Sequence, residues 1–229
     1  MSIAAKNGMV NGSTQRTHHF SDEERRGVYR AIYERRDVRS QFLPDPVPDE
    51  VLGRILDAAH HAPSVGFMQP WDFIVIRDAA VRQAVHRNFE CANRQAAGVY
   101  QGEQRKLYDG LKLAGILDAP VNLCVTCDHE RPKGRGLGRQ TNPALALYST
   151  VCAVQNLWLA SRAESLGVGW VSIVDYDQLK ATLGIPPGLT LVAYLCIGYV
   201  SEFRPHPDLE EKGWEVRSDI ASVTHFDRW

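Results

Sequence analysis

The sequence lacks an excess of charge of either sign. Of its 229 residues, 26 are Lys or Arg and 27 are Asp or Glu, which gives a net charge of -1 at pH 7. A chain that is close to neutral offers no overall field to attract nucleic acid or an anionic membrane. Any anion that the protein binds must therefore be held by a local cluster of cations.

A long uninterrupted apolar run is also missing. The most apolar stretch, residues 144–160, is shorter than the roughly 20 apolar residues of a membrane span. It is interrupted by Ser149, Thr150, Gln155 and Asn156. We expect a helix buried in the core or in a subunit interface. The first twenty residues contain no apolar segment of signal-peptide length, so we predict a cytoplasmic protein with a flexible tail over residues 1–20.

Cysteine is scarce and odd in number, which argues against a disulfide framework. The five residues are Cys91, Cys124, Cys127, Cys152 and Cys196. We expect them to be buried, reduced thiols. Cys124 and Cys127 form a C-x-x-C without a second pair, and on a strand their side chains would point to opposite faces. The eight histidines show none of the usual metal-binding spacings, so we predict no metal site.

The remaining pattern predicts helices and strands of a single α+β domain over residues 21–229, with a C-terminal extension. Ser21 and Glu24 form a capping box at the start of the first helix. Helices are expected at about residues 22–36, 49–61, 78–97, 103–117, 143–166 and 175–183. Strands are expected at residues 71–76, 121–127, 167–174 and 189–200. The polar tail after Pro205 is expected to lie over another surface, its own or that of a second subunit.

A glycine-rich loop over residues 129–142 invites a dinucleotide-binding interpretation. However, the spacing of Gly134, Gly136 and Gly138 does not fit that motif, and the loop starts too far after its strand. Its cations are Arg131, Lys133, Arg135 and Arg139. A flexible, solvated loop is favoured over one that closes on an anionic ligand.

Three arginines and an aspartate follow the first helix, in the run Arg35-Arg36-Asp37-Val38-Arg39. Cations in a last helical turn complement the helix dipole, but that accounts for one or two of the arginines and not for Asp37. Guanidinium groups also bind phosphate bidentately. Farther on, Ser64 and Gly66 precede a strand, where a glycine would let backbone N–H groups approach a planar ligand. An anionic cofactor site and a capped helix end are equally compatible with these residues.

Four strings of residues resemble the nitroreductase family. They are the run Arg35–Arg39, the segment 62–71 (APSVGFMQPW), the segment 148–158 (YSTVCAVQNLW) and the segment 167–172 (GVGWVS). Most nitroreductases carry Ser where this chain has Asp37. With Asp37, the strings resemble the branch of the family that fragments flavin. The resemblance covers about residues 21–215.

The resemblance implies an α/β/α sandwich around a mainly antiparallel sheet, with a long buried core helix, in an intertwined homodimer with active sites at its interface. It implies that reduced FMN is the substrate and that O2 is consumed. The products would be 5,6-dimethylbenzimidazole, the lower ligand of vitamin B12, and erythrose 4-phosphate. A separate NAD(P)H-dependent flavin reductase would supply the reduced FMN.

The resemblance also implies roles for individual residues. The implied flavin-binding residues are Arg35, Arg36, Asp37, Val38, Arg39, Ser64, Gly66 and Ser172. The arginines would hold the phosphate. Asp37 would act as a general acid–base at the junction of ring and sugar, and Ser172 would orient or relay a proton. Arg204 is a weaker candidate for a phosphate ligand.

Two alternative functions stay open at this point. The first is an NAD(P)H-dependent nitroreductase or quinone reductase, in which bound FMN passes electrons on and stays intact. The second is a flavin-binding protein without turnover. Asp37 in place of Ser favours fragmentation over the first alternative, and the activity of an Asp37→Asn variant would separate fragmentation from the second.

Overall fold

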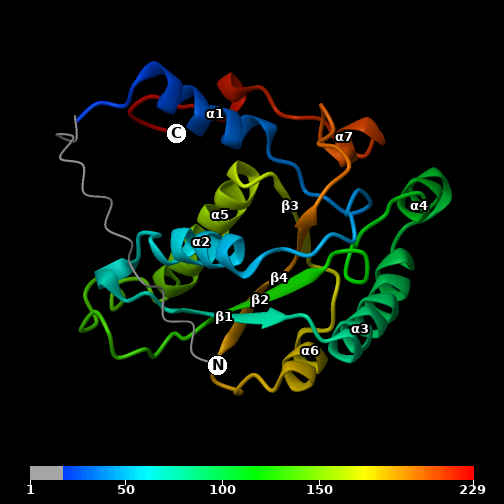
Figure 1. Cartoon of the computed structure of the whole chain (residues 1–229), viewed down its shortest axis with the longest axis horizontal. Helices are drawn as coiled ribbons and strands as arrows, with labels where there is room; N and C mark the ends of the chain where they lie inside the picture. Colours follow the sequence, from blue (N-terminus) through cyan, green and yellow to red (C-terminus); the bar gives the residue numbers. More distant parts are fainter. Residues whose placement is uncertain (1–17) are drawn as a thin grey trace.

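A four-stranded antiparallel sheet forms the centre of the computed structural model, which describes residues 18–229 (Figure 1). Its strands are β1 (Trp71–Ile76), β2 (Val121–Cys127), β3 (Leu166–Val171) and β4 (Thr190–Tyr199). They lie in the order β1-β2-β4-β3, and each neighbouring pair is antiparallel. The expected mainly antiparallel sheet is therefore confirmed. Most of the predicted tail, residues 1–17, lies outside the described residues.

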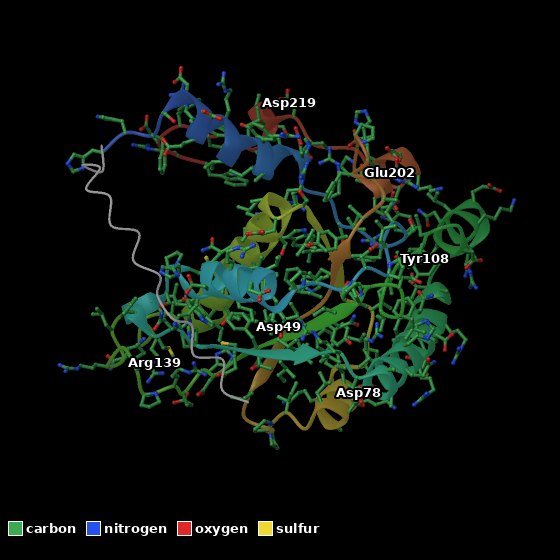
Figure 2. All side chains as sticks on the ribbon, in the orientation of Figure 1. Asp49, Asp78, Tyr108, Arg139, Glu202 and Asp219 are labelled. Carbon is green, nitrogen blue, oxygen red and sulfur yellow. The ribbon has the colours of Figure 1, made fainter. Side chains whose placement is uncertain are left out.

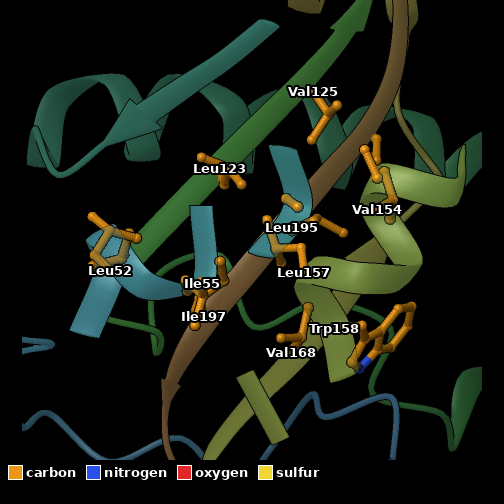
Figure 3. Packing of buried hydrophobic residues seen from close by; sticks show 14 of the residues in the cluster. Leu52, Ile55, Leu123, Val125, Val154, Leu157, Trp158, Val168, Leu195 and Ile197 are labelled. Atoms are coloured by element: carbon orange, nitrogen blue, oxygen red, sulfur yellow. The ribbon is translucent and has the colours of Figure 1, made fainter. Parts of the chain in front are cut away.

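Helices cover both faces of the sheet, because apolar side chains alternate along the strands. On β4, Leu195 and Ile197 pack with α2 (Asp49–His60) and α5 (Leu145–Ala163), as Figure 3 shows. Tyr194 and Cys196 point to the other face and pack with α3 (Ala79–Ala97) and α6 (Tyr176–Leu183). The α/β/α sandwich is confirmed, with α5 as its long core helix. Among residues 18–229, no helix is both long and apolar enough to cross a membrane.

The first helix begins as predicted but packs weakly on its own chain. In α1 (Asp22–Glu34), Ser21 N–H donates to Glu24 Oε2 at 2.7 Å, and Glu24 N–H donates to Ser21 Oγ at 3.2 Å. Within the described residues, no side chain of α1 is buried, although several are apolar. The apolar face of α1 is therefore left for another surface.

The prediction of a helix over residues 103–117 is wrong in its second half. The helix α4 (Gly102–Asp109) is capped at Gly110, and residues 111–120 run on without helical structure. In that stretch, Ile116 and Ala119 are buried against the face of the sheet that α3 and α6 cover. Their burial stabilises the irregular path more than local helix propensity would stabilise another turn.

The expectation of five buried thiols is correct for three cysteines and wrong for two. All five are free, and Cys124, Cys127 and Cys196 are buried, but Cys91 and Cys152 are exposed. Cys124 faces α3 and α6, whereas Cys127 packs against Met68 on the opposite face, as the spacing predicted. Burial raises the pKa of Cys124 to about 12, so this thiol stays protonated at neutral pH.

Candidate functional site

The segment after α1 lies along the outer edge of β3. Val38 N–H donates to Val168 O at 3.0 Å, and the backbone of Asp37 forms a parallel bridge with Val168. A glycine at position 169 permits this close approach, since a Cβ atom there would lie 2.1 Å from Val38 O. The segment around Asp37 and strand β3 are far apart in the sequence, but their contact fixes the backbone position of Asp37.

The carboxylate of Asp37 is held by two donors. Its Oδ1 accepts a hydrogen bond from Trp170 N–H at 3.0 Å, and its Oδ2 lies 2.6 Å from Arg39 Nη2. Burial raises the pKa of Asp37, and the opposing effects of Arg39, the Trp170 N–H and Arg35 do not cancel that rise. Asp37 therefore takes up a proton more readily than an ordinary aspartate, as a group that exchanges protons with a substrate must.

Arg35 and Arg36, which are neighbours in the sequence, have different surroundings. The Arg36 guanidinium donates to Arg204 O at 2.8 Å, to Tyr33 O at 2.9 Å, and to Pro205 O. Arg36 thus ties the end of α1 to the chain that follows β4. The Arg35 guanidinium lies 5.0 Å from the centre of the Trp158 ring and forms no ion pair within the described residues. Arg35 is the more available of the two for a ligand.

Four of the predicted site residues line one cavity of about 120 Å3, which we call the arginine cavity. Its lining consists of Arg35, Arg36, Asp37, Arg39, Pro207, Asp208, Leu209 and Arg217. The last four belong to the C-terminal segment, residues 200–229, and sequence reasoning missed them as site residues. A lone arginine in a polar tail carries no local signal of a site. Several arginines around one hollow are suited to binding a phosphate group.

Arg204, the weaker phosphate candidate, is occupied by carboxylates. Its Nη1 lies 2.8 Å from Asp208 Oδ1 and 3.0 Å from Glu211 Oε2, beside the short helix α7 (Asp208–Glu211). It lines a smaller hollow next to Asp37 and not the arginine cavity. The structure therefore favours a structural role for Arg204.

Ser64 and Gly66 lie in a tight turn after α2, which contains the short 3-10 helix η1 (Val65–Phe67). Gly66, Phe67 and Gln69 all have positive φ angles, of 55°, 56° and 49°, so this backbone is strained. Gln69 N–H donates to Ser64 Oγ at 3.0 Å and stabilises the turn. A backbone held in a rare conformation is frequent at ligand-binding sites.

The glycine-rich loop is largely exposed, as expected for a solvated loop, but part of it packs on this turn. A Cβ atom on Gly66 would lie 2.8 Å from Leu137 O and 3.0 Å from Gly134 O. Arg131 anchors the loop, because its Nη1 donates to Gln69 O at 2.8 Å and to Trp71 O at 3.1 Å. In this arrangement the backbone of the loop fills the space that a side chain at position 66 would need.

Within one chain, the structure does not bring Ser64 and Gly66 to the arginine cavity. The turn is fixed to α5 at Ser149, whereas Arg36 O accepts from Trp158 Nε1 farther along the same helix. Nine residues of helix separate these two contacts by about 13.5 Å. In Figure 2 the labelled Arg139, in the loop, lies at the opposite side of the molecule from Glu202, which lines the smaller hollow.

Ser172 lies directly after β3, two residues beyond Trp170, which binds Asp37. Its side chain is exposed. An extended chain rises about 3.3 Å per residue, so Ser172 is roughly 7 Å along the strand from the Asp37 contact. The structure thus places Ser172 near Asp37 but shows no hydrogen bond between their side chains among the described residues.

Comparison with known proteins identifies the family. A model of the nitroreductase family matches residues 32–199, which is more than half of the chain. This chain belongs to the nitroreductase family. Of the predicted site residues, Arg35–Arg39, Ser64, Gly66 and Ser172 all fall inside the matched region, whereas the C-terminal segment follows it.

Three curated proteins named 5,6-dimethylbenzimidazole synthase are similar to this chain over most of its length. The protein from Rhodospirillum rubrum is 42% identical over 86% of this chain and 93% of its own. One from Rhodobacter capsulatus is 41% identical over 86% and 94%. Among solved structures, an iodotyrosine deiodinase bound to FMN and 3-iodo-L-tyrosine is similar, with a TM-score of 0.70 and 22% identity. It covers 88% of this chain and 100% of its own, and this likeness confirms the fold.

The described residues offer no metal centre. Across residues 18–229, no group of three or more His, Cys, Asp or Glu side chains could hold a metal ion. The side chains around the arginine cavity include four arginines, which are suited to binding an anion, and Asp37, whose raised pKa favours uptake of a proton.

Proposed function

We propose that this protein catalyses the oxygen-dependent fragmentation of reduced FMN to 5,6-dimethylbenzimidazole and erythrose 4-phosphate. The observation that carries the proposal is its identity of 38–42% to three curated 5,6-dimethylbenzimidazole synthases, each over 86% of this chain. It would be a cytoplasmic enzyme that supplies the lower ligand of vitamin B12. FMN is then a substrate, and a separate NAD(P)H-dependent flavin reductase is proposed to deliver it in reduced form.

The geometry around Asp37 supports the proposal. Arg35 and Arg39 line the arginine cavity and are suited to the phosphate of the substrate, with Val38 and Arg36 fixing the segment that carries them. Asp37 would remove and return protons where the ring joins the sugar chain, because burial raises its pKa above that of an ordinary aspartate and it therefore takes up a proton more readily. Ser172 would orient the substrate or relay a proton beside it.

We propose a homodimer in which each site draws on both chains. Ser64 and Gly66 lie too far from the arginine cavity to share one compact site within a single chain, and a partner would supply a second copy of their turn. Two helices leave apolar side chains uncovered for such a contact. On α1 and α5 these are Val28, Tyr29, Ile32, Tyr33, Tyr148 and Val151. Apolar patches of this kind typically mark protein–protein interfaces.

The test is to mix the protein with chemically reduced FMN in air and to analyse the products by mass spectrometry. We expect 5,6-dimethylbenzimidazole and a four-carbon sugar phosphate, and no product from oxidised FMN alone. Recovery of intact flavin after many aerobic cycles would contradict the proposal. Consumption of NADPH with a nitroaromatic substrate, without loss of flavin, would instead indicate an ordinary nitroreductase.

A further inference from the structure

The hydroxyl of Ser172 is not held in place by a contact of its own. The side chain is exposed, and within residues 18–229 it forms no hydrogen bond. Its position therefore depends on the backbone on either side of it. On the side of β3, Trp170 N–H is held by its hydrogen bond to Asp37 Oδ1 at 3.0 Å. On the other side, a short loop over residues 172–175 leads into α6.

A side chain of α3, Asn88, holds the far end of this loop. Asn88 is 3% exposed, and its carboxamide binds both backbone polar groups of a single residue. Asn88 Nδ2 donates to Asp175 O at 2.9 Å, and Asp175 N–H donates to Asn88 Oδ1 at 2.8 Å. Two hydrogen bonds to one residue fix the orientation of its backbone as well as its position. Because Asn88 is buried, the bonds are shielded from water on that side, which strengthens them.

The loop has little freedom between its two ends. Val174 N–H donates to Ser172 O at 3.2 Å, and the Val174 side chain packs in the same apolar cluster as the buried residues of α3. Asp175 also caps α6 with its side chain, so the helix fixes the direction in which the chain leaves the loop. Ser172 thus lies in a short segment whose ends are hydrogen-bonded to Asp37 and to Asn88.

We infer that Asn88 is a positioning residue for the proposed reaction, because it sets where the Ser172 hydroxyl lies beside Asp37. Asn88 does not line the arginine cavity and acts through the backbone of Asp175. A group that relays a proton must lie within hydrogen-bond distance of its partner, and a displacement of about 1 Å can cost about 100-fold in rate. The inference rests on the proposed function for the role of Ser172.

The experiment is a double-mutant cycle between Asn88 and Ser172. Wild type, Asn88→Ala, Ser172→Ala and the double variant are assayed for kcat at saturating reduced FMN in air. We expect Asn88→Ala to lower kcat by about tenfold, and to have little further effect once Ser172 is replaced, because effects that act through one group do not add. Hydrogen exchange of the backbone amides of residues 172–175 should become faster in Asn88→Ala.

A second variant and a control accompany the cycle. Asn88→Asp keeps the size of the side chain and still accepts from Asp175 N–H, but it donates to Asp175 O only when it is protonated. Its kcat relative to wild type should therefore rise as the pH is lowered. Asn156→Ala is the matched control, because it removes the hydrogen bond from Asn156 Nδ2 to Ala58 O, at 3.2 Å, which joins α5 to α2. It should leave kcat and the exchange at residues 172–175 unchanged.

The outcomes separate this inference from the proposed function. If the wild type fragments reduced FMN, but Asn88→Ala lowers kcat by the same factor with and without the Ser172 hydroxyl, the inference is overturned and the reaction stands. An unchanged kcat in Asn88→Ala, or unchanged exchange at residues 172–175, would also overturn the inference.

If the wild type fragments no FMN, the proposed reaction is wrong, and the same four proteins are compared by their affinity for reduced FMN under nitrogen. A loss of affinity in Asn88→Ala that vanishes in the Ser172→Ala background would then support the positioning role. An equal loss in both backgrounds, or no loss in either, would overturn it.

Discussion

The carboxylate of Asp37 is the group on which the proposed reaction depends most. An amide at this position can still accept the Trp170 N–H through its oxygen but cannot take up a proton. We expect Asp37→Asn to bind reduced FMN within about threefold of the wild type, while product formation falls by about 100-fold or more. Anaerobic titration and mass spectrometry of the aerobic mixture measure the two effects. The exposed Asp45→Asn is the control, and equal product from Asp37→Asn and wild type would remove Asp37 from the mechanism.

The ion pair between Arg39 and Asp37 makes the pH dependence of the reaction testable. Burial raises the pKa of Asp37, and Arg39 opposes that rise by stabilising the ionised form. If Arg39 is replaced by Gln, the pKa of Asp37 rises further. When the pH is lowered, a reaction that needs the ionised carboxylate then begins to slow at a higher pH than in the wild type. We therefore expect the acidic limb of the kcat profile, measured at saturating reduced FMN, to move to higher pH in Arg39→Gln.

The conservative variant of the same residue is the control for this shift. Arg39→Lys keeps the positive charge beside Asp37, so its acidic limb should stay near that of the wild type, although its affinity for the phosphate falls. An unchanged limb in Arg39→Gln would show that Arg39 does not control the ionisation of Asp37.

At the scale of elements, the contact between the Asp37 segment and β3 depends on Gly169. A methyl group there would meet Val38 O at 2.1 Å, so the segment must move away and the hydrogen bond from Trp170 to Asp37 must break. We expect Gly169→Ala to lower the free energy of unfolding by about 1–3 kcal/mol, as overpacking does, and to abolish most product formation. Chemical denaturation and the mass-spectrometric assay measure these effects.

Gly53→Ala is the matched control for that substitution. Gly53 lies inside α2, and a Cβ atom there meets nothing within 4 Å. Alanine loses less conformational entropy than glycine on forming a helix, so the variant should be about 0.5–1 kcal/mol more stable. If Gly169→Ala behaves like Gly53→Ala, the close approach at β3 does not constrain Asp37.

At the scale of the whole molecule, the uncovered faces of α1 and α5 predict the oligomeric state. Ile32 and Val151 are 39% and 40% exposed, so replacing both with Lys should not disturb the core of the chain but should break an apolar interface. We expect light scattering to give twice the chain mass of 25.6 kDa for the wild type and the single chain mass for the double variant. The double variant should also lose product formation, because its sites are incomplete.

Val75→Lys is the control for that loss. Val75 is 39% exposed and belongs to β1, not to α1 or α5. The Val75→Lys variant should have the same mass and the same activity as the wild type. A wild-type protein that is monomeric and active would refute the shared site.

Much of the fold could be predicted because its signals are local. The capping box at Ser21 and the apolar runs of β1 and β2 lie in neighbouring residues, and the structure has both strands at the predicted bounds. The end of α4 could not be predicted in this way. Its position depends on Ile116 reaching the sheet, a contact between residues that are distant in the sequence.

By itself, the sequence determined the family and the cluster from Arg35 to Arg39, because contiguous residues carry both signals. Only the tertiary structure decided what each arginine contacts. Arg36 donates to backbone carbonyls, and Arg39 forms an ion pair with Asp37. Arg35 lies over the Trp158 ring and is available to bind a ligand. The tertiary structure also brought Arg217 to the arginine cavity and kept Gly66 away from it. These outcomes depend on where the C-terminal segment and α5 lie in space, and the packing of distant residues leaves no pattern in the local sequence.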